Sequence, residues 1–407
     1  MPSFDSKFNE KHLVGSEETR RRKFNPQNLF LSVLHLVGGK NKEGYLHALS
    51  RTWDLVSDLR NMPVKSALTK ARKRVSFEFF KDCFDQVIVN YEAHRRTWRG
   101  LRVYATDGDR YQLPRSEDHI KHDYKGFAFS KTGETHYLQM YTVHCYDVLS
   151  GVTKDFRYSS ELDEIQLGCE CATGMDSKSI TLYDRLFLGK NLVLAHKASN
   201  SFFIARCRTT GRGVFNEILG FAKGGRNNTH FLIEGVVIEL LKVKNPRTKE
   251  TYVYATNLAR SRFKNKEISD LYALRWEVET CNRDLTDTMK IEQWHSQHLN
   301  GILQEIYASL WLMNQVRIQM TAKSRQACTL KALFNYEKSN FKLILDFILN
   351  NLEDLVRKRS RTLEKRLSFL LRISKEKRRR RNRSYPRQVK STPKLYKLAS
   401  FAERSAK

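Results

Sequence analysis

The order of strand-like and helix-like patterns from residue 101 to residue 207 constrains the fold more than any other feature of this sequence. Five short stretches rich in apolar and β-branched residues predict strands, and a helix-like stretch (ELDEIQLGCECATG) separates the third from the fourth. The expected strands are LRVYAT at 101–106, HYLQMYTVHCYDV at 136–148, VTKDFRYSS at 152–160, SITLYDR at 179–185 and SFFIARC at 201–207. Strands, a helix and strands in this order predict an α/β core with a mixed five-stranded sheet.

Segments of a different character flank this core. Helical patterns precede it, strand-like patterns follow it, and two long helices are expected at 266–289 and 301–320. The predicted parts are a helical N-terminal DNA-binding domain at 1–98, a core at 99–207 and 258–320, a β-rich insertion at 208–257, a helical region at 321–371 and a basic tail at 372–407.

The charge of the chain favours a polyanionic partner. There are 73 Lys and Arg against 44 Asp and Glu, which gives a formal net charge of +29. Nucleic acid is the usual partner of such a chain, because each neutralised phosphate releases a counterion. An anionic membrane is the alternative, but no apolar run approaches the roughly 18–20 residues that a membrane span needs. We therefore expect nucleic acid as the partner, and no membrane.

The cysteines and the N-terminus indicate a cytoplasmic protein. The seven cysteines are scattered and odd in number, which is not typical of a disulfide framework. Cys169 and Cys171 form a C-x-C, whereas a zinc site would need C-x2-C and a second pair. The N-terminal segment is polar and has no signal-peptide pattern. We interpret the cysteines as small buried hydrophobic residues in a reducing cytoplasm.

Two segments concentrate positive charge. PVKSALTKARKRV at 63–75 begins with a proline that is acceptable at the first position of a helix. This helix would read DNA in a helix-turn-helix-like bundle, or it would be a solvated basic face, and the sequence favours neither. A run of four arginines in the tail predicts phosphate contacts without sequence preference. The residues expected to contact DNA are Lys70, Arg72, Lys73 and Arg74 in the first segment and Arg378, Arg379, Arg380 and Arg381 in the second.

Three acidic residues follow an order that suits metal-dependent chemistry on phosphodiesters. Asp107 ends the first strand in YATDGD, where Gly108 would let the backbone turn away, Asp184 ends a later strand in TLYDR, and Glu279 lies on the first long helix. Side chains at strand ends can converge at one edge of a sheet, and a helix crossing that edge can add a third. Each acid also has a non-functional interpretation. Asp107 would be a turn residue, Asp184 would form a local ion pair, and Glu279 would face solvent on its helix.

Together, the three carboxylates predict a metal site. Carboxylate oxygens suit Mg²⁺ or Mn²⁺ rather than zinc. Two such ions about 3.5–4 Å apart can activate water and stabilise the leaving 3′ oxygen of a phosphodiester. We therefore expect Asp107, Asp184 and Glu279 to be both the catalytic residues and the metal ligands.

The first long helix also predicts a face that contacts DNA. At about 100° per residue, Arg275, Glu279, position 286 and Lys290 fall within about 60° of Tyr272 on a straight helix. Such a mixed stripe is not typical of an apolar core face. We expect Arg275 and Lys290 to contact phosphates, and Tyr272 or Trp276 to stack or hydrogen-bond.

These motifs resemble the DDE transposases of the bacterial IS-four group, which includes the Tn-five and Tn-ten transposases. The group has a Y-x(2)-R-x(3)-E-x(6)-K signature, matched here by YALRWEVE at Tyr272, Arg275 and Glu279. VYATDGDRYQLP resembles the group's strand-end D-G motif, and Asp184 with Arg185 matches the group's D-R motif. KSALTKARKRVSFEFFKDCF and SYPRQVK are also similar to segments of the group, so the resemblance covers roughly residues 25–390.

The resemblance implies an RNase H-like fold of the retroviral integrase superfamily, in an α/β chain with a β-rich insertion and a helical N-terminal domain. It implies a transposase that binds double-stranded DNA, namely the terminal inverted repeats of its insertion sequence and the target. Cleavage would use two Mg²⁺ or Mn²⁺ ions, and transposition would be cut-and-paste through a hairpin. It also implies a homodimer in the synaptic complex and a bacterial, nucleoid-associated location.

One position departs from the signature. Thr286 stands where the group has Lys, and Lys290 lies one helical turn further on. We expect Lys290 to make the displaced phosphate contact, and the alternative is a decaying element. Two other functions stay open: a catalytically silent DNA-binding repressor derived from a transposase, and a stand-alone RNase H-like nuclease.

Overall fold

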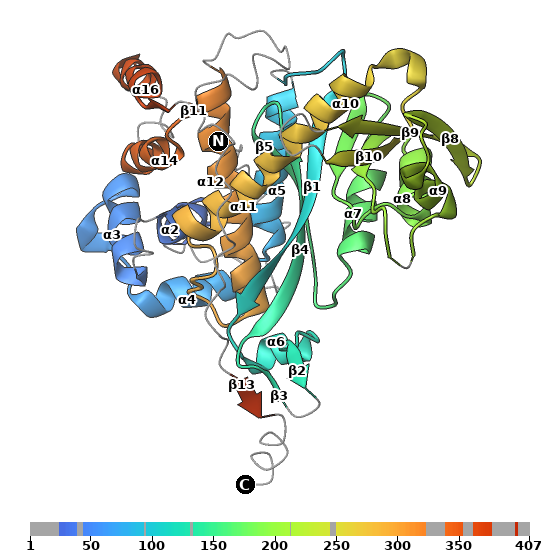
Figure 1. Ribbon diagram of the computed structural model, residues 1–407. Helices are drawn as coiled ribbons and strands as arrows, with labels where there is room; N and C mark the ends of the chain where they lie inside the picture. The colour runs from blue at the N-terminus through green and yellow to red at the C-terminus, as the bar shows by residue number, and fades with distance from the viewer. Residues whose placement is uncertain are drawn as a thin grey trace.

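A single mixed sheet forms the centre of the molecule, with helices on both of its faces (Figure 1). The computed structural model describes residues 24–38, 44–92, 95–130, 133–211, 213–244, 250–322, 338–352, 361–376 and 395–397. In the described part of the chain, this sheet has eight strands in the order β5-β4-β1-β6-β7-β10-β9-β8. Their bounds are β1 Arg102–Leu113, β4 Leu138–Asp147, β5 Val152–Ser159, β6 Ser179–Tyr183, β7 Phe202–Arg206, β8 Asn228–Ile233, β9 Val236–Lys244 and β10 Thr251–Thr256.

The prediction of a mixed α/β sheet is confirmed, but the expected number of five strands is wrong. The five predicted strands are β1, β4, β5, β6 and β7, and they lie next to one another. Three further strands come from residues 208–257, which we expected to form an insertion. β10 pairs antiparallel with β7, as in Tyr254 opposite Arg206, so these strands extend the core sheet. The pairing satisfies the backbone groups along the outer edge of β7, which would otherwise be unpaired.

β1 differs from its prediction in length. The sequence predicted that it ends near Asp107, where Gly108 would turn the backbone away. Instead, β1 continues to Leu113 and pairs with β4 over the whole stretch, with Gly108 opposite Val143. Gly108 does not have a positive φ angle, so its conformation does not explain the glycine. The reason lies in its surroundings, described below.

Different helices cover the two faces of the sheet. Val103 and Ala105 of β1 belong to the main core, which also contains Val278 of α11 (Trp276–Arg283) and the buried side chains of α12 (Leu299–Ala322). Tyr104, between them in sequence, packs against Leu167 of α7 (Glu164–Thr173). Because side chains alternate along a strand, α11 and α12 cover one face and α7 covers the other. α8 (Lys190–Ala198) and α9 (Asn216–Lys223) cover the same face as α7 (Figure 1).

The N-terminal helices pack on α12. They are α2 (Pro26–Gly38), α3 (Tyr45–Val56), α4 (Lys65–Arg74) and α5 (Glu78–Tyr91), and η1 (Leu59–Asn61) joins the middle pair. Phe30 of α2 contacts Trp311 of α12 edge to face, with 5.2 Å between ring centroids. Their apolar side chains belong to the main core cluster. The helical character predicted for this part of the chain is confirmed.

Smaller elements complete the described chain. α6 (Glu117–Lys121) follows β1, and β2 (Ala128–Ser130), β3 (Gly133–Thr135) and β13 (Leu395–Lys397) form a separate three-stranded sheet. β13, which belongs to the predicted tail, therefore pairs with β3, which lies between β1 and β4 in the sequence. The C-terminal region contains α14 (Phe341–Asn350) and α16 (Arg361–Ile373), with β11 (Lys338–Ser339) paired to β12 (Lys375–Glu376).

Candidate active site

Two of the predicted acidic residues lie next to each other because of the register between β1 and β6. These strands are parallel, and Ala105 pairs with Leu182. Asp107 follows Ala105 by two residues, and Asp184 follows Leu182 by two residues at the end of β6. Ala105 and Leu182 both belong to the main core, so alternation directs Asp107 to the face covered by α11. The backbone N–H of Leu186 donates to Oδ1 of Asp184 at 2.6 Å and fixes the turn that follows the strand.

Arg275 links the carboxylate of Glu279 to that of Asp107. It lies in η4 (Ala273–Arg275), immediately before α11, and Glu279 lies one turn later in α11. Its Nη1 is 3.3 Å from Oδ1 of Asp107, and its Nη2 is 2.6 Å from Oε1 of Glu279. The guanidinium therefore bridges the carboxylates of a strand and a helix. The structure thus places Glu279 of α11 and Asp107 of β1 on the same guanidinium.

The environment of Asp107 disfavours its charge. Burial raises its pKa from 3.8 to about 7, and the neighbouring carboxylates of Glu279, Asp184 and Glu164 act in the same direction. The guanidinium of Arg275 opposes these effects but does not outweigh them. A site with more negative charge than its own cation neutralises is suited to binding a further cation.

The helix that contains Arg275 and Glu279 is less regular than the straight helix predicted for 266–289. α10 (Asn265–Tyr272) passes through the 3-10 turn η4 into α11, and α11 continues as the π-helical turn η5 (Asp284–Thr288). Thr286 lies in the π turn and donates its hydroxyl to the carbonyl of Asn282 at 3.1 Å. Lys290 has a φ angle of 49° and follows the end of the helix. The even spacing of 100° per residue therefore does not describe positions 286 and 290.

The other residues predicted for this face differ in exposure. Tyr272 is buried and packs against Tyr254 of β10, with 5.0 Å between ring centroids. The Trp276 side chain is 57% exposed, which leaves its ring accessible to a ligand. Arg185 is exposed directly after Asp184, and Lys290 is half-buried. Arg283, which the sequence analysis did not single out, is also exposed, one turn after Glu279 on α11.

Glu164 is a further acidic residue near Asp107 and Asp184 that the sequence analysis did not single out. It is the first residue of α7, on the opposite face of the sheet from α11. Burial raises its pKa, and Asp184 adds to this effect, whereas the backbone N–H of Gly108 donates to the carboxylate and lowers it. A Cβ atom on residue 108 would lie 2.5 Å from Oε1 of Glu164. The glycine after Asp107 therefore leaves space for Glu164, and an acidic residue in the first turn of the predicted helix was the available signal.

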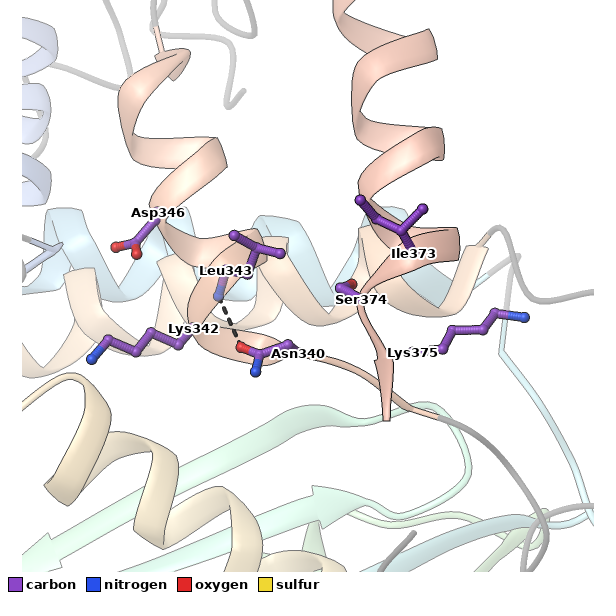
Figure 2. A pocket seen from close by; sticks show the side chains of 7 residues that line it. All are labelled: Asn340, Lys342, Leu343, Asp346, Ile373, Ser374 and Lys375. Carbon is purple, nitrogen blue, oxygen red and sulfur yellow. Dashed lines mark hydrogen bonds between the residues drawn. The ribbon is translucent and has the colours of Figure 1, made fainter. Parts of the chain in front are cut away.

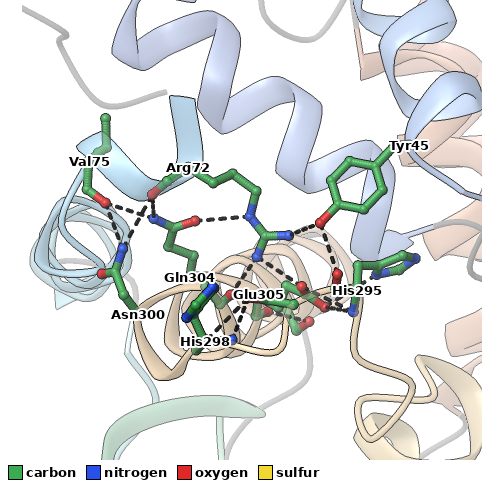
Figure 3. Close-up of polar contacts among 11 residues, drawn as sticks. Tyr45, Arg72, Val75, His295, His298, Asn300, Gln304 and Glu305 are labelled. Carbon is green, nitrogen blue, oxygen red and sulfur yellow. Dashed lines mark hydrogen bonds and ion pairs between the residues drawn. The ribbon is translucent and has the colours of Figure 1, made fainter. Parts of the chain in front are cut away.

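The residues predicted to contact DNA on α4 fall into two groups. Lys70 and Lys73 are exposed and Arg74 is half-buried, which is compatible with a contact to phosphate. Arg72 is 4% exposed and forms an ion pair of 2.8 Å with the fully buried Glu305 of α12. Its other partners are the Gln304 side chain, the Tyr45 hydroxyl and the Gly301 carbonyl (Figure 3). The prediction that Arg72 contacts DNA is therefore wrong, because its guanidinium is used to attach α4 to α12.

Other predictions concern regions away from the carboxylates. Arg378, Arg379, Arg380 and Arg381 lie outside the described residues. No helix in the described ranges is long and apolar enough to span a membrane. A pocket of about 460 Å³ lies between α14 and α16 and is lined by none of the predicted site residues (Figure 2). Its lining residues are Asn340, Lys342, Leu343, Asp346, Ile373, Ser374 and Lys375.

Comparison with known proteins identifies the class to which this fold and these carboxylates belong. The family described as "Transposase DDE domain" matches residues 98–315, which is more than half of the 407-residue chain and includes all three predicted acids. The chain therefore belongs to the DDE transposase family, whose members act in DNA transposition and recombination.

A solved structure is also similar to the chain: the cryo-EM structure of a piggyBac transposase synaptic complex with hairpin DNA. The similarity has 11% sequence identity and a TM-score of 0.47, and covers 90% of this chain and 80% of that one. None of the curated proteins matches the sequence.

Proposed function

We propose that this protein is the transposase of a bacterial insertion sequence of the IS-four group. It would bind the terminal inverted repeats, cut the DNA at the element ends and join those ends to a target by cut-and-paste, with a hairpin intermediate. The observation that supports this proposal best is the bridge from Asp107 to Glu279 through Arg275, because it brings two of the three predicted acids together.

The donor atoms around Asp107 fit divalent metal. All three acids offer oxygen, which Mg²⁺ and Mn²⁺ prefer, and burial, together with the neighbouring carboxylates, raises the pKa of Asp107. Within the described ranges, no three His, Cys, Asp or Glu side chains already lie close enough to hold an ion. Binding by Asp107 and Glu279 would therefore require Arg275 to move from between them.

A second observation concerns where Arg275 could move. Its Nε atom is buried and has no hydrogen-bond acceptor among the described residues. A phosphate oxygen would satisfy such a donor, and a guanidinium can bind phosphate through two parallel hydrogen bonds. Arg275 would thus exchange its carboxylate partners for the DNA backbone when metal and DNA bind together.

Each residue of the site then has a distinct role. Asp107, Asp184 and Glu279 would bind two ions, which supply an activated water and stabilise the leaving 3′ oxygen. Arg275, Arg185 and Lys290 would orient the phosphates, and Trp276 would stack on a base. Tyr272 would fix the position of Arg275 from the buried side, since its ring packs against β10.

The remaining parts of the proposal concern the DNA and the assembly. Lys70, Lys73 and Arg74 on α4, and the run Arg378–Arg381, would add phosphate contacts that do not depend on sequence. Two ends must be cut together, so we propose a homodimer in the synaptic complex. The expected location is the bacterial nucleoid.

The experiment that tests this function is metal-dependent cleavage of DNA containing the repeats that flank the gene. Asp107→Ala, Asp184→Ala and Glu279→Ala should each abolish cleavage and leave binding of the ends largely intact. Asp109→Ala is the matched control, because Asp109 lies on the same strand and its carboxylate accepts from the N–H of Arg110. Binding without cleavage by the wild-type protein would favour the silent repressor, and cleavage without joining would favour the stand-alone nuclease.

A further inference from the structure

Glu164 approaches the active site from the face of the sheet that Glu279 does not use. Glu279 lies on α11, which covers the face with Val103 and Ala105. Glu164 begins α7, which covers the face with Tyr104. Asp163 caps this helix by accepting from the N–H of Gln166 at 3.0 Å, so the start of α7 is fixed. The two glutamates therefore approach Asp107 and Asp184 from opposite faces of the sheet.

The glycine at position 108 allows this approach. Residues 104, 106 and 108 alternate onto the face covered by α7, so any side chain at 108 would point toward Glu164. An added Cβ would lie 2.5 Å from Oε1 and 2.6 Å from Cγ of Glu164. Both distances are well below a normal van der Waals contact. The carboxylate thus lies against the backbone of the residue that follows Asp107.

This position has an electrostatic cost that a cation would remove. Glu164 is half-buried, and Asp184 and Asp107 repel it, whereas the N–H of Gly108 and the charge of Arg110 offset only part of this cost. Carboxylates that repel one another in a partly buried site are stabilised when metal is bound. A purely structural role for a helix-start acid would not require it to lie beside two other acids.

We infer that Glu164 is a fourth carboxylate of the active site and binds one of the two divalent ions, together with Asp184, directly or through a metal-bound water. This inference rests on the proposed function. It assigns to α7 a metal-binding role in addition to those proposed for Asp107, Asp184 and Glu279.

The test compares Glu164→Gln with Glu170→Gln. Glutamine keeps an acceptor for the N–H of Gly108 and removes only the charge, and Glu170 lies on the same helix, six residues after Glu164. Binding of Mn²⁺ to the metal-free, full-length protein is measured by electron paramagnetic resonance, and the Mn²⁺ dependence of cleavage is measured in parallel. Glu164→Gln should weaken Mn²⁺ binding by roughly 10- to 100-fold, as for other residues that support metal ligands. Glu170→Gln should bind Mn²⁺ like the wild type.

Gly108→Ala tests the same carboxylate without changing any acid. The added methyl group would meet the flexible end of Glu164, which can swing away, so the melting temperature should change little while Mn²⁺ binding weakens. Mn²⁺ binding by Glu164→Gln at the wild-type level would overturn the inference, as would Gly108→Ala with unchanged Mn²⁺ binding. If the proposed function itself were wrong, the result would differ, because the wild-type protein would then show no metal-dependent cleavage.

Discussion

Arg275 lies 3.3 Å from Asp107, although the two residues are 168 positions apart in the sequence. The same guanidinium lies 2.6 Å from Glu279, so one cation serves two acids. Burial and the neighbouring carboxylates nevertheless keep the pKa of Asp107 at about 7. The charge of these acids is therefore incompletely neutralised by Arg275, and the stability of the site should depend on pH in a predictable direction.

The first prediction is that, without divalent metal, the contribution of Asp107 to the free energy of unfolding decreases as the pH rises from about 4 to about 7. The pKa is about 7 in the folded chain and 3.8 in the reference state. In this range the folded chain keeps a proton that the unfolded chain has released, so rising pH favours unfolding. Asp107→Asn removes this titration.

The measurement is the melting temperature of both proteins in EDTA between pH 4 and pH 8. The wild type should lose stability relative to Asp107→Asn up to about pH 7 and change no further above it. Other titrating acids, such as Asp147, are present in both proteins and cancel in the comparison. A difference that stays constant over this range would contradict the prediction.

The second prediction separates the buried and exposed cations of α4. Arg72→Met leaves the buried Glu305 without its guanidinium partner, and breaking such a pair typically costs about 3–5 kcal/mol of folding stability. Lys70→Ala and Lys73→Ala should leave the melting temperature unchanged, weaken DNA binding and reduce its dependence on salt. Thermal melts and salt titrations of binding check both outcomes. Wild-type stability in Arg72→Met would show that the network in Figure 3 contributes little.

The third prediction concerns Trp276. Because 57% of its side chain is exposed, Trp276→Ala should have almost no effect on the melting temperature. It should weaken binding of DNA ends by about 1–3 kcal/mol if the indole stacks on a base. Trp276→Phe should recover most of this loss, because phenylalanine keeps an aromatic face. Equal binding by the alanine and phenylalanine variants would exclude stacking.

The fourth prediction concerns the displaced lysine of the signature. Lys290 has a φ angle of 49°, a conformation that glycine adopts without strain. Lys290→Gly therefore removes the charge with a residue that adopts this φ angle freely, and Lys290→Ala removes the charge while keeping the Cβ atom of lysine. If Lys290 contacts phosphate, single-turnover cleavage should slow by about one to two decades, from a loss of roughly 1.5–3 kcal/mol.

Arg283→Ala is the matched comparison for Lys290→Gly, because Arg283 is exposed one turn after Glu279. If Arg283→Ala cleaved DNA slowly while Lys290→Gly kept full activity, the displaced phosphate contact would be assigned to Arg283 and not to Lys290. Full activity in both variants would favour a decaying element.

The sequence predicted the central strands because apolar alternation is a local signal, but it placed the end of β1 near Asp107, whereas β1 continues to Leu113. It did not predict that β8, β9 and β10 join the core sheet, since strand partners depend on contacts between distant residues. The straight-helix geometry failed at Thr286 and Lys290 because one π turn changes the spacing of every later residue. Arg72 was assigned to DNA because it lies in a basic, helix-like segment, and only its contact with Glu305 gives its role.

Glu164 was missed for a related reason. Its neighbours Gly108 and Asp184 are far from it in sequence, and Gly after Asp is a common turn pattern. The interpretation of Gly108 as a turn residue was a reasonable local inference that the long pairing of β1 with β4 contradicts. Close approach between two segments is a second reason for a glycine, and it is visible only in three dimensions.

The pairing of β10 with β7 has a consequence for engineering this protein. A surface domain attached by two linkers can be excised or replaced with little effect on its host. Removing residues 208–257 here would instead uncover the hydrogen-bonding edge of β7. An unprotected edge of this kind invites intermolecular β-pairing and aggregation. A shortened version of this protein would therefore need a replacement strand, and not merely a shorter loop, to stay monodisperse in solution.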